Sequence, residues 1–169
     1  EVILEKWKVP AVIDSLNKAH PYEEVAYDLY PLDNEFADTG AGMVGELPEP
    51  MDQEAFLRML KEKMAAEVVR YSGKTQKPIQ RVAVCGGSGS FLIRDAQRAG
   101  ADCLVTADLK YHQFFDATDN FLLADIGHYE SEQFTTDLIM EYIRQKFANF
   151  APQLPLIKGM NTNPVKYLT

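Results

Sequence analysis

Residues 81–147 carry apolar positions in two alternating patterns, and this alternation predicts a sheet covered by helices. Short apolar runs indicate strands, and they lie at 81–85, 103–106 and 121–126. Segments with helical spacing or length follow each run, at 90–99, 110–117 and 131–147. A β–α alternation of this kind is typical of parallel strands joined by helical connections. The pattern predicts an α/β fold, with a mostly parallel sheet and helices on both faces.

The last of these helices is predicted to bury one apolar face. Its inner positions would be Phe134, Leu138, Tyr142 and Ile143. Upstream, 51–66 is amphipathic and predicts another helix, whose apolar side carries Phe56, Leu57, Leu60 and Met64. Residues 68–71 predict a short strand. The segment 34–50 is rich in glycine and proline, so we expect a loop or a bent strand there.

The first 33 residues predict a strand, a helix and a second strand. Residues 1–4 and 25–30 are the expected strands, and a helix follows Pro10 and stops at His20, which precedes a proline. Such a unit is only part of a small α+β sandwich. Because the chain begins with Glu1 inside an apolar run, we expect it to be a piece of a longer protein.

Composition and charge narrow the function classes. The chain has 46 % hydrophobic and 25 % charged residues, which is typical of a globular protein. Its net charge of −8 disfavours a nucleic-acid partner. No apolar run approaches the roughly 18–20 residues of a membrane helix, so no membrane association is predicted. Cys85 and Cys103 lie in apolar runs at no known zinc spacing, which favours buried thiols in a cytoplasmic protein.

Polar groups follow all three predicted strands, and in parallel sheets ligands bind at that edge. His128 and Glu132 are four residues apart, so both would project from one face of the first helical turn. Imidazole and carboxylate are ligands of zinc, manganese or iron. The alternative is a histidine at a helix start beside a surface acid that favours the helix dipole. Two ligands do not hold a metal tightly, so others must come from elsewhere.

His112 and Asp108 follow the middle strand and are the nearest further candidates. Asp108 could orient an imidazole, as carboxylates behind metal ligands do. The alternative is a solvated aspartate and a helix-capping histidine. The glycines of 86–89 could bind an anion, with Asp108 at a suitable distance for a ribose, but they lack the full dinucleotide spacing. We therefore interpret them as a tight turn and assign no cofactor-binding residue.

Several segments together resemble the C-terminal half of the Nif-three family, whose members are often described as GTP cyclohydrolase type-two homologues. They are 85–89 (CGGSG), 100–112 (GADCLVTADLKYH), 125–132 (DIGHYESE) and 161–165 (NTNPV). A further segment, 19–32, resembles the end of the PII-like or CutA-like domain inserted in longer members. The resemblance implies two domains: residues 1–34, the end of that ferredoxin-like insert, and 35–169, the C-terminal lobe of a two-lobed fold.

The resemblance also implies a dinuclear metal site between two lobes. His128 matches the family's histidine ligand and Glu132 its carboxylate ligand, while His112 matches a histidine at the edge of the site and is a candidate catalytic residue. The remaining ligands, a pair of histidines and an aspartate, belong to the other lobe. We expect two divalent ions (zinc, iron or manganese) in the complete protein and weak or no metal binding in this chain.

The functional hypothesis is half of a metal-dependent, hydrolase-like protein that acts on a nucleotide or phosphoester. The alternative is a non-catalytic regulatory or partner-binding module with a structural metal. The resemblance further implies a homo-oligomer, a hexamer in the complete family members, while this chain could form a dimer instead.

Overall fold

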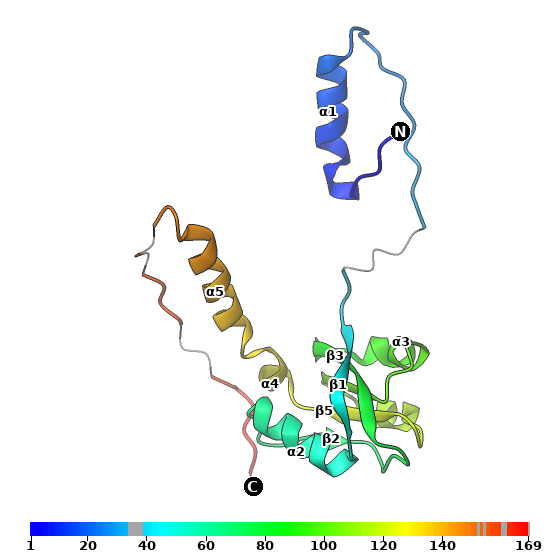
Figure 1. Cartoon of the computed structure of the whole chain (residues 1–169), viewed down its shortest axis with the longest axis vertical. Helices are drawn as coiled ribbons and strands as arrows, with labels where there is room; N and C mark the ends of the chain where they lie inside the picture. Colours follow the sequence, from blue (N-terminus) through cyan, green and yellow to red (C-terminus); the bar gives the residue numbers. More distant parts are fainter. Residues whose placement is uncertain (34–38, 152, 154, 160–161, 169) are drawn as a thin grey trace. The chain divides into compact units, whose positions relative to one another are not determined.

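The structure is a computed structural model that describes residues 1–33, 39–151, 153, 155–159 and 162–168. The chain divides into two compact units, Glu1–Asp38 and Thr39–Thr169 (Figure 1). The assignment of residues 1–34 to an inserted domain stays a prediction.

The first unit contains a short 3₁₀ helix, Lys6–Lys8 (η1), followed by the helix α1, Val9–Ala19. Pro10 lies in the first turn of α1, and the helix ends at His20, as the sequence predicts. The strands predicted at 1–4 and 25–30 are wrong, because neither segment pairs with a strand among the described residues. A strand is stable only when a neighbour takes its backbone hydrogen bonds, and the described part of this unit provides no such neighbour.

The second unit is built on a five-stranded sheet in the order β1-β3-β4-β5-β2. The bounds of the strands are β1 Met43–Met51, β2 Arg70–Tyr71, β3 Ile79–Ser88, β4 Cys103–Ala107 and β5 Leu122–Asp125. The three middle strands are parallel, and an antiparallel strand closes each edge. This arrangement confirms the predicted α/β fold and the strands predicted near 81–85, 103–106, 121–126 and 68–71.

Of the two alternatives for 34–50, a loop or a bent strand, the strand is correct for the second part, which forms β1 with an irregularity in its pairing between Glu46 and Met51, while 34–38 lies outside the described residues. Gly42, just before β1, explains how this edge strand fits. A Cβ on Gly42 would stand 2.7 Å from the backbone oxygen of Val84 in β3. The glycine therefore permits a close backbone approach, which its sequence context did not distinguish from a loop.

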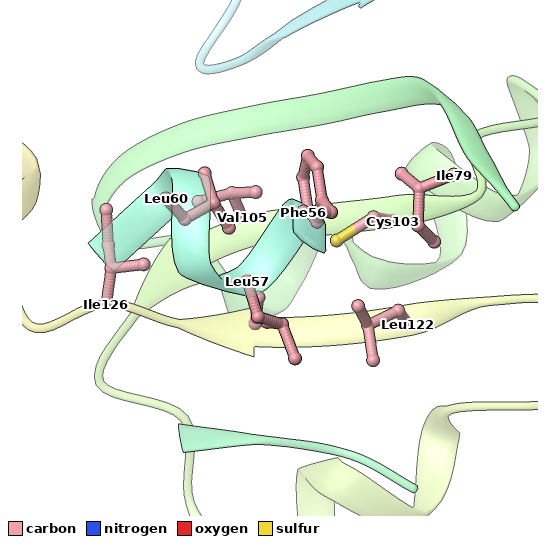
Figure 2. Close-up of a cluster of buried hydrophobic side chains, with 9 residues drawn as sticks. Phe56, Leu57, Leu60, Ile79, Cys103, Val105, Leu122 and Ile126 are labelled. Carbon is pink, nitrogen blue, oxygen red and sulfur yellow. The ribbon is translucent and has the colours of Figure 1, made fainter. Parts of the chain in front are cut away.

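Apolar side chains fill both faces of the sheet. On one face, the helix α2, Gln53–Lys63, packs Phe56, Leu57 and Leu60 against Cys103 and Val105 (Figure 2). On the other face, the helix α3, Ile93–Arg98, packs with strand residues of the opposite parity such as Leu104 and Leu123. Helices on both faces are therefore confirmed.

Local signals set the ends of these two helices. The carboxylate of Asp52 accepts hydrogen bonds from the backbone N–H groups of Glu54 and Ala55, which caps α2. Gly100, at a φ of +72°, lies just after α3 and ends it. A 3₁₀ helix, Ser90–Leu92 (η2), leads into α3, and another, Tyr111–Asp116 (η3), follows β4.

The long helix predicted over 131–147 is instead two helices, α4 (His128–Glu132) and α5 (Thr135–Phe147). The inner face predicted for it is also wrong, since α5 has no buried residue and Leu138 is 70 % exposed. The apolar residues of α5 do recur at helical spacing, but no other element of the described residues covers them. No helix of the described residues is both long and apolar enough to cross a membrane.

Candidate metal centre

The ends of three parallel strands bring the predicted site residues to one edge of the sheet. Asp108 follows β4 directly, His128 follows β5 after Gly127, and Gly86–Ser88 form the last residues of β3. Gly127 has a φ of +92°, a backbone conformation that glycine adopts at little cost. The conformation of Gly127 lets α4 begin at His128, so that the first residues of this helix face the edge of the sheet.

His128 lies between two carboxylates. Its Nδ1 is 2.6 Å from Oδ2 of Asp108, and its Nε2 is 3.3 Å from Oε2 of Glu132. All three side chains are about half exposed, at 52 %, 49 % and 51 %. The hydrogen bond with Asp108 raises the pKa of His128 against the opposing effect of desolvation, and the negative charges of Asp108 and Glu132 add to the rise.

Asp108 and Glu132 therefore each contact one of the two ring nitrogens of His128. The four-residue spacing of His128 and Glu132 predicts that they share a helix face, and the structure shows this. The sequence leaves open whether Asp108 orients an imidazole or is a solvated aspartate, and in the structure its carboxylate contacts the imidazole of His128.

The buried carboxylate of Asp125 fixes the two loops that carry Asp108 and His128. Asp125, 3 % exposed at the end of β5, pairs with Arg70 of β2. The Asp125 carboxylate also accepts hydrogen bonds from the backbone N–H groups of Leu109, at 2.8 Å, and Gly127, at 3.1 Å. The sequence analysis missed this role, although an aspartate at the end of an apolar strand was a signal for it.

The glycine segment 86–89 has a different role from the one the sequence suggests. Gly86–Ser88 continue β3 rather than form a turn, and the backbone N–H of Gly87 donates a 2.8 Å hydrogen bond to Oγ of Ser131. The carbonyl of Gly87 in turn accepts one from Thr106, at 3.0 Å. Because this N–H group already has a partner in α4, the segment joins α4 to the sheet.

An open cleft of about 1060 Å³ lies beside these residues. Asp108, His128 and Glu132 line it, and so does the tail of the chain through Asn163 and Tyr167. Pro164 and Val165 of the tail also line it. The tail therefore forms one wall of the cleft, a role that the sequence analysis did not foresee.

His112 lies apart from this cleft, whose lining does not include it. Its ring contacts the rings of Tyr111 and Phe115 in η3, with centroids 5.2 Å and 6.5 Å away. The structure thus does not bring His112 together with His128 and Glu132, and its catalytic role stays a prediction.

Gly87 leaves open the space that a cation beside His128 and Glu132 would need. A Cβ on this residue would stand 2.6 Å from Oε1 of Glu132 and 3.4 Å from Nε2 of His128. The donor set, one imidazole nitrogen and one carboxylate, suits a divalent metal. In the described part of the chain, no cluster of three or more histidine, cysteine or acidic side chains is arranged to hold a metal. The two donors fit as half of a site.

Comparison with known proteins places this chain in a family. The family described as Duf34/NIF3 (NGG1p interacting factor 3) matches residues 9–164. The chain is 42 % identical over 174 residues to the "GTP cyclohydrolase 1 type 2 homolog" of Bacillus subtilis (strain 168), covering 99 % of this chain and 45 % of that protein. The chain thus spans about half the length of the curated relatives it matches.

Two solved structures are similar to this one. The Staphylococcus aureus protein SA1388 superimposes with a TM-score of 0.73 at 27 % identity, over 99 % of this chain and 55 % of that one. The Bacillus cereus protein related to NIF3 gives a TM-score of 0.70 at 32 % identity, over 98 % of this chain and 46 % of that one. With the match over 9–164, these similarities show that the chain belongs to the Duf34/NIF3 family.

Proposed function

We propose that this chain provides half of a dinuclear divalent-metal site in a metal-dependent, hydrolase-like protein that acts on a nucleotide or phosphoester. The observation that carries the proposal is the pair of donors on the cleft: Nε2 of His128 and Oε2 of Glu132 lie 3.3 Å apart. Gly87 beside them has no side chain to occupy the space. A bound divalent ion of this kind activates water and stabilises an oxyanion.

In this proposal, the residues of this chain would bind the metal ion and fix its position in the cleft. His128 would offer Nε2 in its neutral form, and Glu132 would offer a carboxylate oxygen from the same helix face. The α4 backbone that carries both is attached to β3 through Ser131, whose Oγ accepts from Gly87 and donates to the carbonyl of His128 at 2.8 Å. Mixed nitrogen and oxygen donors suit zinc, iron and manganese.

The remaining ligands would come from outside the described residues. Zinc needs about three or four ligands, and the pair described here supplies two. The relatives are about twice as long as this chain, so the missing ligands would belong to the part that they have in addition. The nucleotide class of substrate enters from the name "GTP cyclohydrolase 1 type 2 homolog", which belongs to the relatives.

A zinc titration of the 169-residue chain tests the metal site. We expect weak zinc binding by calorimetry, and a loss of about tenfold or more in affinity for His128→Ala and for Glu132→Gln. Glu141→Gln serves as the control, because Glu141 is on α5, where its carboxylate accepts a hydrogen bond from Gln145. Equal zinc affinity in the wild type and His128→Ala would contradict the proposal, provided that circular dichroism shows both chains folded.

Catalysis needs a separate measurement on a protein of the relatives' length. Release of phosphate or ring-opened product from a nucleotide, lost in the variant at His128, would support the hydrolase reading. A protein that holds the metal and turns over no nucleotide or phosphoester would instead favour the regulatory or partner-binding module.

Self-association belongs to the same proposal, because it comes from the resemblance to the family. Light scattering of the purified chain gives its mass directly. A homodimer or larger assembly supports this part of the proposal, and a monomer at all concentrations contradicts it for this chain.

A further inference from the structure

We propose that Asp108 is a positioning residue for His128. It holds the imidazole with its proton on Nδ1, so that the unprotonated Nε2 faces the cleft with its lone pair available to a metal ion. The consequence for metal binding rests on the function proposed above. The effect on the imidazole itself does not, and it can be measured without metal.

The two distances around the ring support this assignment. A neutral imidazole has one N–H group, and the other nitrogen is an acceptor or a metal ligand. Oδ2 of Asp108 is 2.6 Å from Nδ1, whereas Oε2 of Glu132 is 3.3 Å from Nε2. The shorter contact with Asp108 favours the proton on Nδ1. The lone pair of Nε2 then lies beside the carboxylate of Glu132, where a cation would contact both.

The backbone at Asp108 is a second, independent observation. Its φ of +57° is in the left-handed region, which glycine adopts more easily than any other residue. A turn that needed only this conformation would accept glycine. An aspartate is present instead, and its carboxylate reaches the imidazole of a helix that begins 20 residues later.

The neighbouring contacts hold the backbone next to Asp108 in place. Leu109, the residue after Asp108, is held through both of its backbone polar groups. Its N–H donates to Asp125 at 2.8 Å, and its carbonyl accepts from Arg70 at 3.0 Å. Asp125 also binds the N–H of Gly127, next to His128. One buried carboxylate therefore sets both the loop of Asp108 and the start of α4.

The test compares Asp108→Gly with the wild-type chain by nitrogen-15 NMR of the histidine rings. Glycine keeps the backbone conformation and removes only the carboxylate. At about pH 9, where imidazole is neutral, we expect the wild-type His128 to be protonated mainly on Nδ1, and Asp108→Gly to shift toward the Nε2–H form. Asp108→Asn keeps an oxygen that can accept from Nδ1, so we expect it to restore part of the wild-type ratio.

Zinc titration of the same variants gives the functional readout. We expect Asp108→Gly to bind zinc about 10- to 100-fold more weakly than the wild type. Asp119→Gly is the control, because this aspartate precedes β5, at the opposite end of the strand from His128, and its carboxylate accepts from Gln76.

The outcomes separate the two proposals. The same ratio of protonated forms in the wild type and Asp108→Gly would overturn the positioning role, and so would unchanged zinc affinity in this variant when His128→Ala has lost it. Unchanged zinc affinity in His128→Ala would overturn the proposed function alone, while the NMR comparison would still decide the role of Asp108.

Discussion

Asn163, in the tail of the chain, donates a 2.9 Å hydrogen bond from Nδ2 to Oε1 of Glu130, a residue of α4 that is only 5 % exposed. This contact joins residues 33 positions apart and attaches the tail to the wall of the cleft. A buried carboxylate needs such partners, because losing one leaves a charged group with less solvation than it had in water.

The first prediction concerns this contact. Asn163→Ala should lower the free energy of unfolding by about 1–3 kcal/mol, since it removes a partner of a buried charged group. Urea unfolding followed by circular dichroism measures the change. Asn120→Ala is a suitable control, because Asn120 is an exposed residue in the turn before β5. Equal losses in the two variants would show that the tail does not depend on Glu130.

The second prediction concerns the space beside the donor pair. Gly87→Ala puts a methyl group 2.6 Å from Oε1 of Glu132, at a φ of +61°. The carboxylate has to move, so zinc affinity should fall, and the left-handed backbone should cost about 1–2 kcal/mol of stability. Gly45→Ala is the matched control, because nothing lies within 4 Å of its added Cβ. A Gly87→Ala chain with normal stability and zinc affinity would contradict this account of the site.

The third prediction concerns pH and Asp102. Burial alone would raise the pKa of Asp102, but the hydrogen bond with Lys77 and those from the backbone of Arg81 and Gln80 outweigh it and lower the pKa. A lowered pKa means that the folded state favours the carboxylate. Its contribution to stability is therefore complete above the unfolded pKa of about 3.9 and is lost as pH falls through the folded pKa.

Urea unfolding of Asp102→Asn and the wild type over a pH series tests this. The variant should be less stable by about 1–3 kcal/mol near neutral pH, and the difference should narrow below about pH 4. Asp95→Asn is the control, since that side chain is 60 % exposed and contacts only Arg98 of its own helix among the ion pairs of the described residues. A difference that stays constant down to low pH would refute the ionised form of Asp102 as the cause.

The fourth prediction concerns Cys103. Burial raises the pKa of this thiol far above its usual range, and the nearby Asp102 adds to the rise. Because the thiolate is the reactive form, a disulfide reagent should not modify Cys103 in the native chain and should do so only after unfolding. Mass spectrometry locates the label, and Cys85→Ser removes the other thiol. Labelling of native Cys103 as fast as that of an unfolded peptide would contradict the prediction.

The elements that the sequence predicts correctly depend on short-range signals. The buried runs at 103–106 and 121–126 became β4 and β5, and the helix near 51–66 became α2 with Phe56, Leu57 and Leu60 buried. In each of these segments, the apolar side chains pack against other buried side chains of the second unit. The predictions that were wrong lacked such a surface: the strands of the first unit have no described neighbour, and the apolar face of α5 remains exposed.

In the candidate site, too, some relations follow from local spacing and others from the packing of the sheet. That His128 and Glu132 share a helix face follows from their spacing alone, because residues four apart lie on the same side of a helix. The groups that surround them could be identified only from the folded chain: Asp108 from the end of β4, Gly87 from the end of β3 and the tail through Asn163. Those relations depend on strand order and register, which are set by the packing of the whole sheet and not by any local pattern of residues.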